Sequence, residues 1–178
     1  EWKDENFYVL IPGTSGTVVG KEWPVTSFSN IAKKVYQQTG WKGIICGAQQ
    51  EHILGEQIRG QCDAPLQNLS GQTTLPVLAS LLSQSRLTLS NDTGAVFISS
   101  AVGTPSVCIL GGGHFGRFLP YPDLPGQINN LKEIFHKMPC YGCNWDCVYP
   151  IKEGEPAPCI ANVSVDTVWE KIKPLLTK

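Results

Sequence analysis

The chain has 178 residues, of which 42% are hydrophobic and 16% are charged. This length is sufficient for one domain with a proper hydrophobic core. With a formal net charge of −1, the chain lacks the excess of basic residues that binding to nucleic acid or to an anionic membrane surface requires. No apolar stretch approaches the roughly twenty residues of a membrane-spanning helix.

Strand and helix patterns alternate along the first half of the chain. Phe7–Ile11 is a short apolar run that ends at a Pro-Gly pair, as a buried strand does. Apolar residues then recur at helical spacing from Phe28 to Tyr36, with Thr26 or Ser27 as the N-cap and Gly40 just beyond the end. We expect the following elements up to residue 84: a strand at 41–46, a weaker helix at 52–59, a loop with a short strand or turn at 63–71, and an amphipathic helix around 75–82 capped by Thr73 or Thr74.

The same alternation continues to the C-terminus. We expect strands at 86–90, 106–110 and 131–136, a small apolar helix at 94–102, and a terminal helix that Ser164 caps and Pro174 ends or kinks. Alternation with short connections predicts an α/β fold with a doubly wound, mostly parallel sheet and helices on both faces. Ligands of such sheets bind outside the carboxyl ends of the strands. The loops that follow the predicted strands, at 12–20, 47–51, 90–94 and 111–113, therefore fall on one edge of the sheet.

The loop at 90–94 reads Ser-Asn-Asp-Thr-Gly and lies between a predicted strand and a predicted helix. A helix that opens there presents unpaired backbone N–H groups and a positive dipole end, which suit a diphosphate. Gly94 lets a ligand approach the backbone closely, while Asp92 and Thr93 add a carboxylate and a hydroxyl. The alternative is that Asp92 or Thr93 only caps the helix.

Three segments in chain order resemble glycosyltransferase family 9, which includes the ADP-heptose:lipopolysaccharide heptosyltransferases. They are the PGTS and KEWP motifs within 12–24, the SNDTG, GTP and PY motifs within 90–122, and the cysteine-bearing tail from 139 to 168. The resemblance implies that residues 1–178 form the Rossmann-like, C-terminal donor-binding domain of a GT-B enzyme. It further implies that the N-terminal domain, with the acceptor site and the catalytic base, is absent from this chain.

The resemblance also implies the reaction. A sugar, heptose or a related one, would pass with inversion from a nucleoside diphosphate sugar, ADP-linked by the family pattern, to a hydroxyl of a lipopolysaccharide-type glycolipid. No cofactor or metal would be needed, because positive groups and helix N-termini stabilise the leaving diphosphate. The implied partners are the nucleotide-sugar and the glycolipid, and we expect a cytoplasmic protein, either free or peripheral at the inner membrane.

The resemblance assigns donor-binding roles to particular residues. Lys21 matches the lysine that contacts the donor phosphates, although without the family it reads as a solvated surface lysine. Glu51 matches the acid that accepts hydrogen bonds from the ribose hydroxyls, and Asp92, Thr93 and Gly94 match the donor-binding core.

The neighbouring loops add further candidates. Hydroxyls are offered by Thr14, Ser15 and Thr17, and their spacing does not say which reaches phosphate. After the glycine run, His114 and Arg117 offer charge near the leaving diphosphate, unless they simply face solvent. Three residues beyond the DTG motif, where the family usually has a histidine close to the donor, this chain has Phe97, which leaves the base and the sugar open.

The cysteines require a separate interpretation. Seven is an odd number, which argues against a fully paired disulfide framework and for a reducing compartment. Four of them, Cys140, Cys143, Cys147 and Cys159, are enough for a tetrahedral metal site or an iron–sulfur centre. The spacing departs from the common paired zinc pattern, so packed or free thiols are the preferred interpretation and a metal the alternative.

Two other functions compete with the glycosyltransferase. One is a related GT-B sugar-nucleotide enzyme of the hexosamine 2-epimerase type, whose acid–base residues we cannot assign in this sequence. The other is a non-catalytic module in which the cysteine tail binds a metal or a partner and the DTG motif is only a helix cap.

Overall fold

The computed structural model describes residues 5–16, 18–121 and 130–176. In this part of the chain, six parallel strands form one sheet in the order β3-β2-β1-β4-β5-β6. The strands are β1 (Phe7–Ile11), β2 (Lys42–Ile45), β3 (Leu66–Asn68), β4 (Thr88–Asn91), β5 (Ser106–Ile109) and β6 (Leu131–Ile134). This is the strand order of the Rossmann fold, so the predicted fold class is confirmed. The order reverses between β1 and β4, and a crevice forms at such a point.

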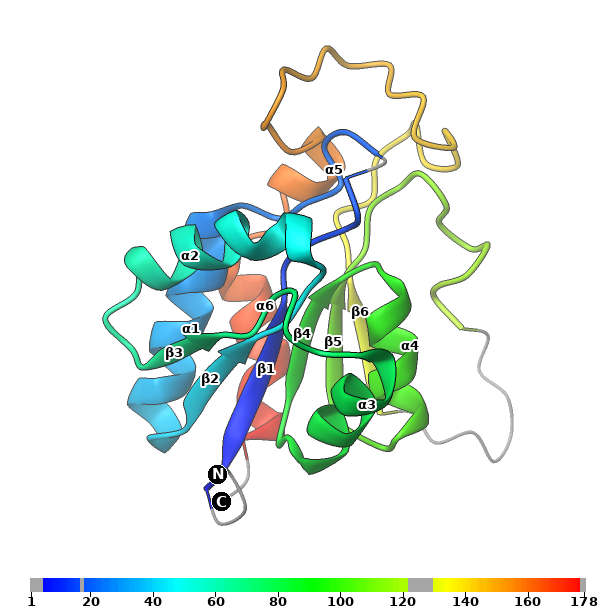
Figure 1. Cartoon of the computed structure of the whole chain (residues 1–178). Coiled ribbons are helices and arrows are strands. Elements are labelled where there is room, and N and C mark those ends of the chain that lie inside the picture. The colour runs from blue at the N-terminus through cyan, green and yellow to red at the C-terminus, as the bar shows by residue number, and fades with distance from the viewer. Residues whose placement is uncertain (1–4, 17, 122–129, 177–178) are drawn as a thin grey trace.

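Helices cover both faces of the sheet (Figure 1). They are α1 (Val25–Thr39), α2 (His52–Gly60), α3 (Leu75–Gln84), α4 (Gly94–Ala101), α5 (Pro158–Ala161) and α6 (Val165–Ile172), with the 3-10 turns η1 (Gln49–Glu51) and η2 (Lys173–Leu175). Helix α1 packs against α2 and α6, whereas α3 packs against α4 on the opposite face. None of the described helices is long and apolar enough to cross a membrane.

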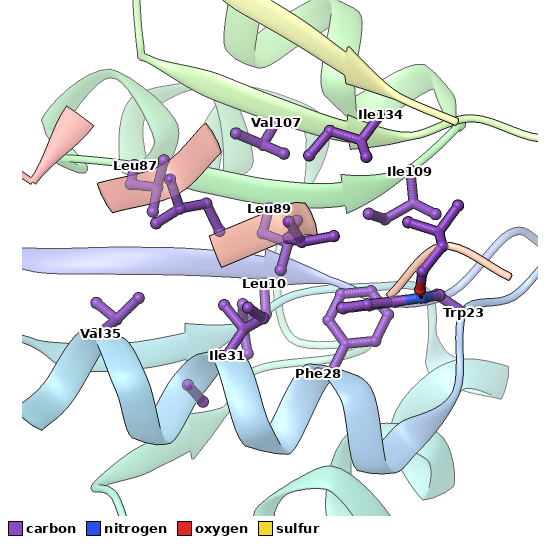
Figure 2. Close-up of a cluster of buried hydrophobic side chains, with 14 of the residues drawn as sticks. Leu10, Trp23, Phe28, Ile31, Val35, Leu87, Leu89, Val107, Ile109 and Ile134 are labelled. Atoms are coloured by element: carbon purple, nitrogen blue, oxygen red, sulfur yellow. Dashed lines mark hydrogen bonds between the residues drawn. The ribbon is translucent and has the colours of Figure 1, made fainter. Parts of the chain in front are cut away.

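The core lies on both sides of β1. Tyr8 and Leu10 point to the α1 and α6 side, where Leu10 lies near Phe28 and Leu89 (Figure 2). The alternate residues of β1 point to α3 and α4. Every β1 residue is at most 3% exposed, which explains why this strand reads as an unbroken apolar run rather than an alternating one. A large side chain buried this completely stabilises the fold by about 1.5–3 kcal/mol.

The start of α1 differs from the prediction. Neither Thr26 nor Ser27 is the N-cap; the helix begins after Pro24, and no side chain caps it. The carbonyl of Pro24 instead accepts the backbone N–H groups of Ser27 at 2.9 Å and Phe28 at 3.2 Å. The predicted end is confirmed, since Gly40 has φ 74° and its N–H bonds to the carbonyl of Tyr36.

Other boundaries also differ from the prediction in detail. Thr74 is the N-cap of α3 by position, but its side chain makes no capping hydrogen bond. Strand β4 extends through Asn91, which the sequence placed in the turn. The four-residue α5 was not predicted, because a single turn is too short to show helical periodicity. Ser164 caps α6 by accepting the N–H of Thr167, as predicted.

Candidate functional site

A cavity of about 630 Å³ opens at the carboxyl ends of the strands, at the crevice between β1 and β4. The loops after β1, β2, β4 and β5 all contribute to its wall. It is lined by all of the predicted donor-binding residues that the structure describes: Thr14, Ser15, Lys21, Glu51, Asp92, Thr93, Gly94 and His114. Thr17 lies outside the described residues. The structure therefore brings together side chains that are up to 100 positions apart in the sequence.

A lysine and an aspartate form an ion pair on the cavity wall. The ammonium of Lys21 lies 3.3 Å from the carboxylate of Asp92, and the two side chains are only 16% and 7% exposed. Lys21 is therefore not the solvated surface lysine that its local sequence allowed. Because the pair is largely shielded from water, its charges act on a ligand more strongly than surface charges would.

The N-terminus of α4 faces the same cavity. Thr93 is the N-cap, and its hydroxyl accepts the N–H of Ala95 at 3.2 Å. Thr93 thus caps the helix and also lines the cavity, so the capping role is confirmed and the donor-binding role stays a prediction. A Cβ added to Gly94 would meet no protein atom within 4 Å. Protein packing therefore does not require a glycine here, and the free space belongs to the cavity.

Glu51 connects two of the loops. Its carboxylate accepts the N–H of Ser15 at 2.8 Å and the N–H of Ala48 at 2.6 Å. Gly13 and Gly47 allow this position, because a Cβ on either would lie within 2.5 Å of the carboxyl group. A carboxylate has about four acceptor sites, so these two bonds leave capacity for the hydroxyls of a ligand.

Glu22, which the sequence did not single out, supports the β1 loop. Its carboxylate accepts the N–H of Thr14 at 3.2 Å and the hydroxyl of the same residue at 3.3 Å. Burial raises the pKa of Glu22, the hydrogen bonds from Thr14 oppose this rise, and the charge of Glu51 adds to it. The glutamate in the KEWP motif therefore shapes the loop around Thr14.

Asn91 is a second supporting residue that the sequence did not reveal. It is fully buried at the end of β4, where its Oδ1 accepts the N–H of Trp23 at 3.2 Å. Its Nδ2 donates to the carbonyl of Pro12. Trp23 in turn donates from its ring to the carbonyl of Val163 at 2.8 Å. These bonds fix both ends of the loop that carries Thr14 and Lys21.

Part of the cavity wall is apolar. It is formed by Leu75 and Leu78 of α3, Ile11 of β1, and Cys46 just after β2. Burial raises the pKa of Cys46 to about 12, so this thiol stays protonated and acts as apolar wall. The sequence predicted α3 as an amphipathic helix and assigned no site role to Leu75, which is 70% exposed at the start of the helix. A face of this kind suits a planar ring.

Of three further residues that the sequence singled out, His114, Arg117 and Phe97, only His114 lines the cavity. His114 lines the cavity, with its Nε2 2.8 Å from Oδ1 of Asn144. Arg117 is exposed, lies over the ring of Phe118, and is not among the residues that line the cavity, so the geometry adds no support to the role predicted for it. Phe97 packs against the core cluster and edge-on to Tyr121 rather than into the cavity.

The four cysteines of the tail lie close to one another but do not form a metal site as arranged. Burial raises the pKa of Cys159, and the nearby thiols of Cys140, Cys143 and Cys147 act in the same direction. All four are free thiols. Among the described residues, no group of three or more His, Cys, Asp or Glu side chains is positioned to hold a metal ion. The arrangement therefore gives no support to the metal alternative.

Taken together, the cavity offers a shielded cation, a helix N-terminus, two carboxylates and an apolar wall. The cation and the helix N-terminus attract an anion. The carboxylates accept hydrogen bonds from hydroxyls, and the leucines contact an apolar ring. A ligand that has all three kinds of group is a nucleoside diphosphate.

Comparison with known proteins gives relatives of one kind. Lipopolysaccharide core heptosyltransferase OpsX of Haemophilus influenzae is 28% identical over 119 residues, which are 66% of this chain and 34% of that protein. Lipopolysaccharide heptosyltransferase 2 of Escherichia coli is 25% identical over 95 residues, which are 51% of this chain and 27% of that protein. The chain thus spans about a third or less of the length of these relatives.

Solved structures share the fold across nearly the whole chain. E. coli ADP-heptose lps heptosyltransferase II superposes with a TM-score of 0.73 at 18% identity, covering 97% of this chain and 47% of that one. A family 9 glycosyl transferase from Veillonella parvula gives 0.73 at 20% identity, again covering 97% and 47%. The dodecameric, iron-containing heptosyltransferase TibC, solved with ADP-D-beta-D-heptose, gives 0.67 at 15% identity, covering 97% and 45%.

The family model agrees with these matches. Residues 2–144 match the model of glycosyltransferase family 9 (heptosyltransferase), which is most of the chain and includes every predicted donor-binding residue. The chain therefore belongs to glycosyltransferase family 9.

Proposed function

We propose that this chain is the donor-binding domain of a glycosyltransferase that takes heptose or a related sugar from an ADP-linked donor. The observation that carries the proposal is the convergence of Lys21, Glu51 and the N-terminus of α4 on one cavity, from three different loops. The relatives are named as lipopolysaccharide heptosyltransferases, and one solved relative holds ADP-2-deoxy-2-fluoro heptose. A lipopolysaccharide-type glycolipid is accordingly the proposed acceptor.

The donor would occupy the cavity in a definite orientation. The diphosphate lies against the ammonium of Lys21, which is paired with Asp92, and against the N-terminus of α4, whose N–H groups and dipole attract an anion. The ribose hydroxyls donate to the carboxylate of Glu51. The base contacts the apolar wall at Leu75 and Leu78. This orientation directs the sugar toward the open side of the cavity.

In the proposed reaction, an acceptor hydroxyl attacks the anomeric carbon from the face opposite the diphosphate. The new carbon–oxygen bond forms as the bond to the diphosphate oxygen breaks, and the electron pair of that bond stays on the diphosphate. The proton of the hydroxyl passes to a base outside this chain, in the half of the enzyme that would bind the acceptor. Lys21 and the helix N-terminus stabilise the charge that develops on the leaving diphosphate.

A calorimetric titration with ADP, UDP, GDP and CDP, without divalent metal, tests the proposal. We expect selective binding of ADP by the 178-residue chain and its loss in Asp92→Ala, because this change leaves Lys21 without its partner and removes an acceptor from the cavity wall. Lys33→Ala is the matched control, since Lys33 forms an exposed ion pair with Asp63 and does not line the cavity. Failure of the wild-type chain to bind any of the four would contradict the proposal.

A further inference from the structure

Two consecutive residues of the segment after β6 have an unusual backbone conformation. Asn144 has φ 52° and Trp145 has φ 66°, and neither is a glycine. A left-handed conformation is uncommon outside glycine, and it is a genuine outlier for a bulky side chain such as tryptophan. Strain of this kind persists only where surrounding contacts fix it, and it gathers at ligand sites. The contacts of these two residues (the 144–145 pair) show what fixes it.

The ring of Trp145 packs against the glycine loop at 111–113. A Cβ added to Gly111 or to Gly113 would lie 2.4 Å from an atom of this ring, so both positions must lack a side chain. The ammonium of Lys21 lies 5.6 Å from the ring centroid, within the range of cation–π attraction. The same ring therefore contacts both the glycine loop and the cation of the cavity.

Directed hydrogen bonds do not hold this ring. Its Nε1 atom is buried and has no hydrogen-bond partner among the described residues. Most buried tryptophan N–H groups find a partner, and leaving one unpaired is unfavourable. The ring of Trp145 is thus kept in place by packing and by Lys21, although the position leaves a donor unsatisfied.

Asn144 contacts His114, the second basic side chain of the cavity, as Trp145 contacts Lys21. Its backbone N–H bonds to the carbonyl of Gly113 at 2.9 Å. Its Oδ1 lies 2.8 Å from Nε2 of His114, which lines the cavity. The backbone of Asn144 is therefore fixed on the glycine loop, and its side chain determines where the His114 ring points.

We propose that the 144–145 pair is a positioning element of the donor site, in which Trp145 holds Lys21 toward Asp92 and Asn144 holds His114 at the cavity wall. A lysine side chain loses rotamer entropy when a ligand fixes it, so a ring that already restricts Lys21 reduces the entropy lost when a diphosphate binds. This inference rests on the proposed function. It adds two residues, from a segment outside the sheet, that set the affinity for the diphosphate.

Two substitutions of Trp145 test the first half of the inference. Trp145→Tyr keeps an aromatic face beside Lys21, whereas Trp145→Leu keeps apolar bulk and removes that face. We expect ADP affinity to stay within about threefold in the tyrosine variant and to fall about tenfold in the leucine variant, the size of a shielded cation–π contact. Val148→Ala, in the same segment and 71% exposed, is the control that should change nothing.

A double-mutant cycle separates positioning from general support of the fold. If Trp145 acts through Lys21, Trp145→Leu should have little further effect on ADP affinity when Lys21→Ala is already present. Losses that multiply in the double variant would show that the two residues act independently, and this would overturn the first half of the inference. A thermal melt of each variant confirms that folded protein is being titrated.

Asn144 requires substitutions that respect its backbone. Asn144→Gly tolerates the left-handed conformation and removes only the side chain, while Asn144→Asp keeps an oxygen beside His114. We expect ADP affinity to fall about fivefold in the glycine variant, as for loss of one ordinary hydrogen bond, and to be retained in the aspartate variant. The loss should disappear in a His114→Ala background.

The outcomes distinguish this inference from the proposed function. If wild-type protein fails to bind ADP and the other nucleoside diphosphates, the proposed function fails and the inference fails with it. If wild-type protein binds and Trp145→Leu and Asn144→Gly bind equally well, the function stands and the positioning role is wrong. Selective loss in these two variants, absent from the Lys21→Ala and His114→Ala backgrounds, would establish the role.

Discussion

Two glycines that line the cavity, Gly13 and Gly94, differ in what surrounds them. A Cβ on Gly13 would lie 2.0 Å from the carboxyl carbon of Glu51, so this glycine makes room for a neighbouring side chain. A Cβ on Gly94 would meet no packed neighbour within 4 Å and would face the cavity, so packing does not require a glycine here.

Gly94→Ala should therefore separate binding from stability. At the first position of α4, alanine stabilises the folded chain by up to about 1 kcal/mol, because it restricts the unfolded chain and favours a helix. The same methyl group should occupy space that a diphosphate needs, and ADP affinity should fall at least tenfold in a calorimetric titration.

The matched control for this prediction is Gly60→Ala. Gly60 also has nothing within 4 Å of an added Cβ and lies at the end of α2, away from the cavity. ADP affinity should be unchanged in this variant. Equal affinities for Gly94→Ala and wild type would mean that the space at Gly94 is not a ligand site.

Glu22 gives a prediction for the pH dependence of stability. Its pKa in the folded chain is raised above the ordinary value of 4.5, chiefly by burial. The folded state then binds this proton more tightly than the unfolded state, so this group lowers the free energy of unfolding as pH rises from 4.5 through the folded-state pKa.

Glu22→Gln removes that titration and keeps an oxygen that accepts the N–H of Thr14. The variant should match wild type below pH 4.5 and be the more stable protein at pH 7. Urea unfolding of both proteins from pH 4 to pH 7 measures the difference. A difference that stays constant across this range would show that the Glu22 carboxyl is not perturbed.

Among the elements, β4 supports the site through its last residue, Asn91. Asn91 is fully buried and connects the carbonyl of Pro12 to the N–H of Trp23, so the strand end and the β1 loop form one unit. Asn91→Ala would leave both of these backbone groups unpaired. We expect a loss of about 2–4 kcal/mol in the free energy of unfolding, which urea denaturation measures.

Asn30→Ala provides the comparison for that prediction, because Asn30 is exposed on α1. Its change in unfolding free energy should lie within about 0.5 kcal/mol of zero. A similarly small effect for Asn91→Ala would show that the loop is not held by this amide.

The elements also show what the sequence could and could not predict. Strand β1 is an unbroken apolar run and helix α1 has a clear helical spacing of apolar residues, and both were found. The start of α1 was misplaced because Thr26 and Ser27 are good capping residues by type, whereas the chain turns at Pro24. Helix α5 is too short to show periodicity in its sequence. Its position depends on long-range contacts, such as the N–H of Ala157 that donates to the carbonyl of Gly20.

The residues of the site also include some that the sequence could predict and some that it could not. Lys21, Glu51 and Asp92 could be placed at the cavity because the family resemblance singled them out and their loops follow predicted strands. Asn91, Glu22 and the 144–145 pair could not, because their roles depend on contacts between segments that no local pattern records. Arg117 was included because it lies close to His114 in sequence, but its side chain lies over Phe118 and does not line the cavity.

At the scale of the whole molecule, one parallel sheet places four loops around one cavity (Figure 1). The segment after β6 lies above the same edge of the sheet and reaches the site through Trp145. The chain nevertheless covers only 47% of the family members it superposes on best among those described above.

A crystal structure of the 178-residue chain with ADP tests the central claim most directly. We predict electron density for the diphosphate between Lys21 and the N-terminus of α4, with the ribose at Glu51 and the adenine against Leu75 and Leu78. Nucleotide bound at any other place, with this cavity empty, would contradict the account.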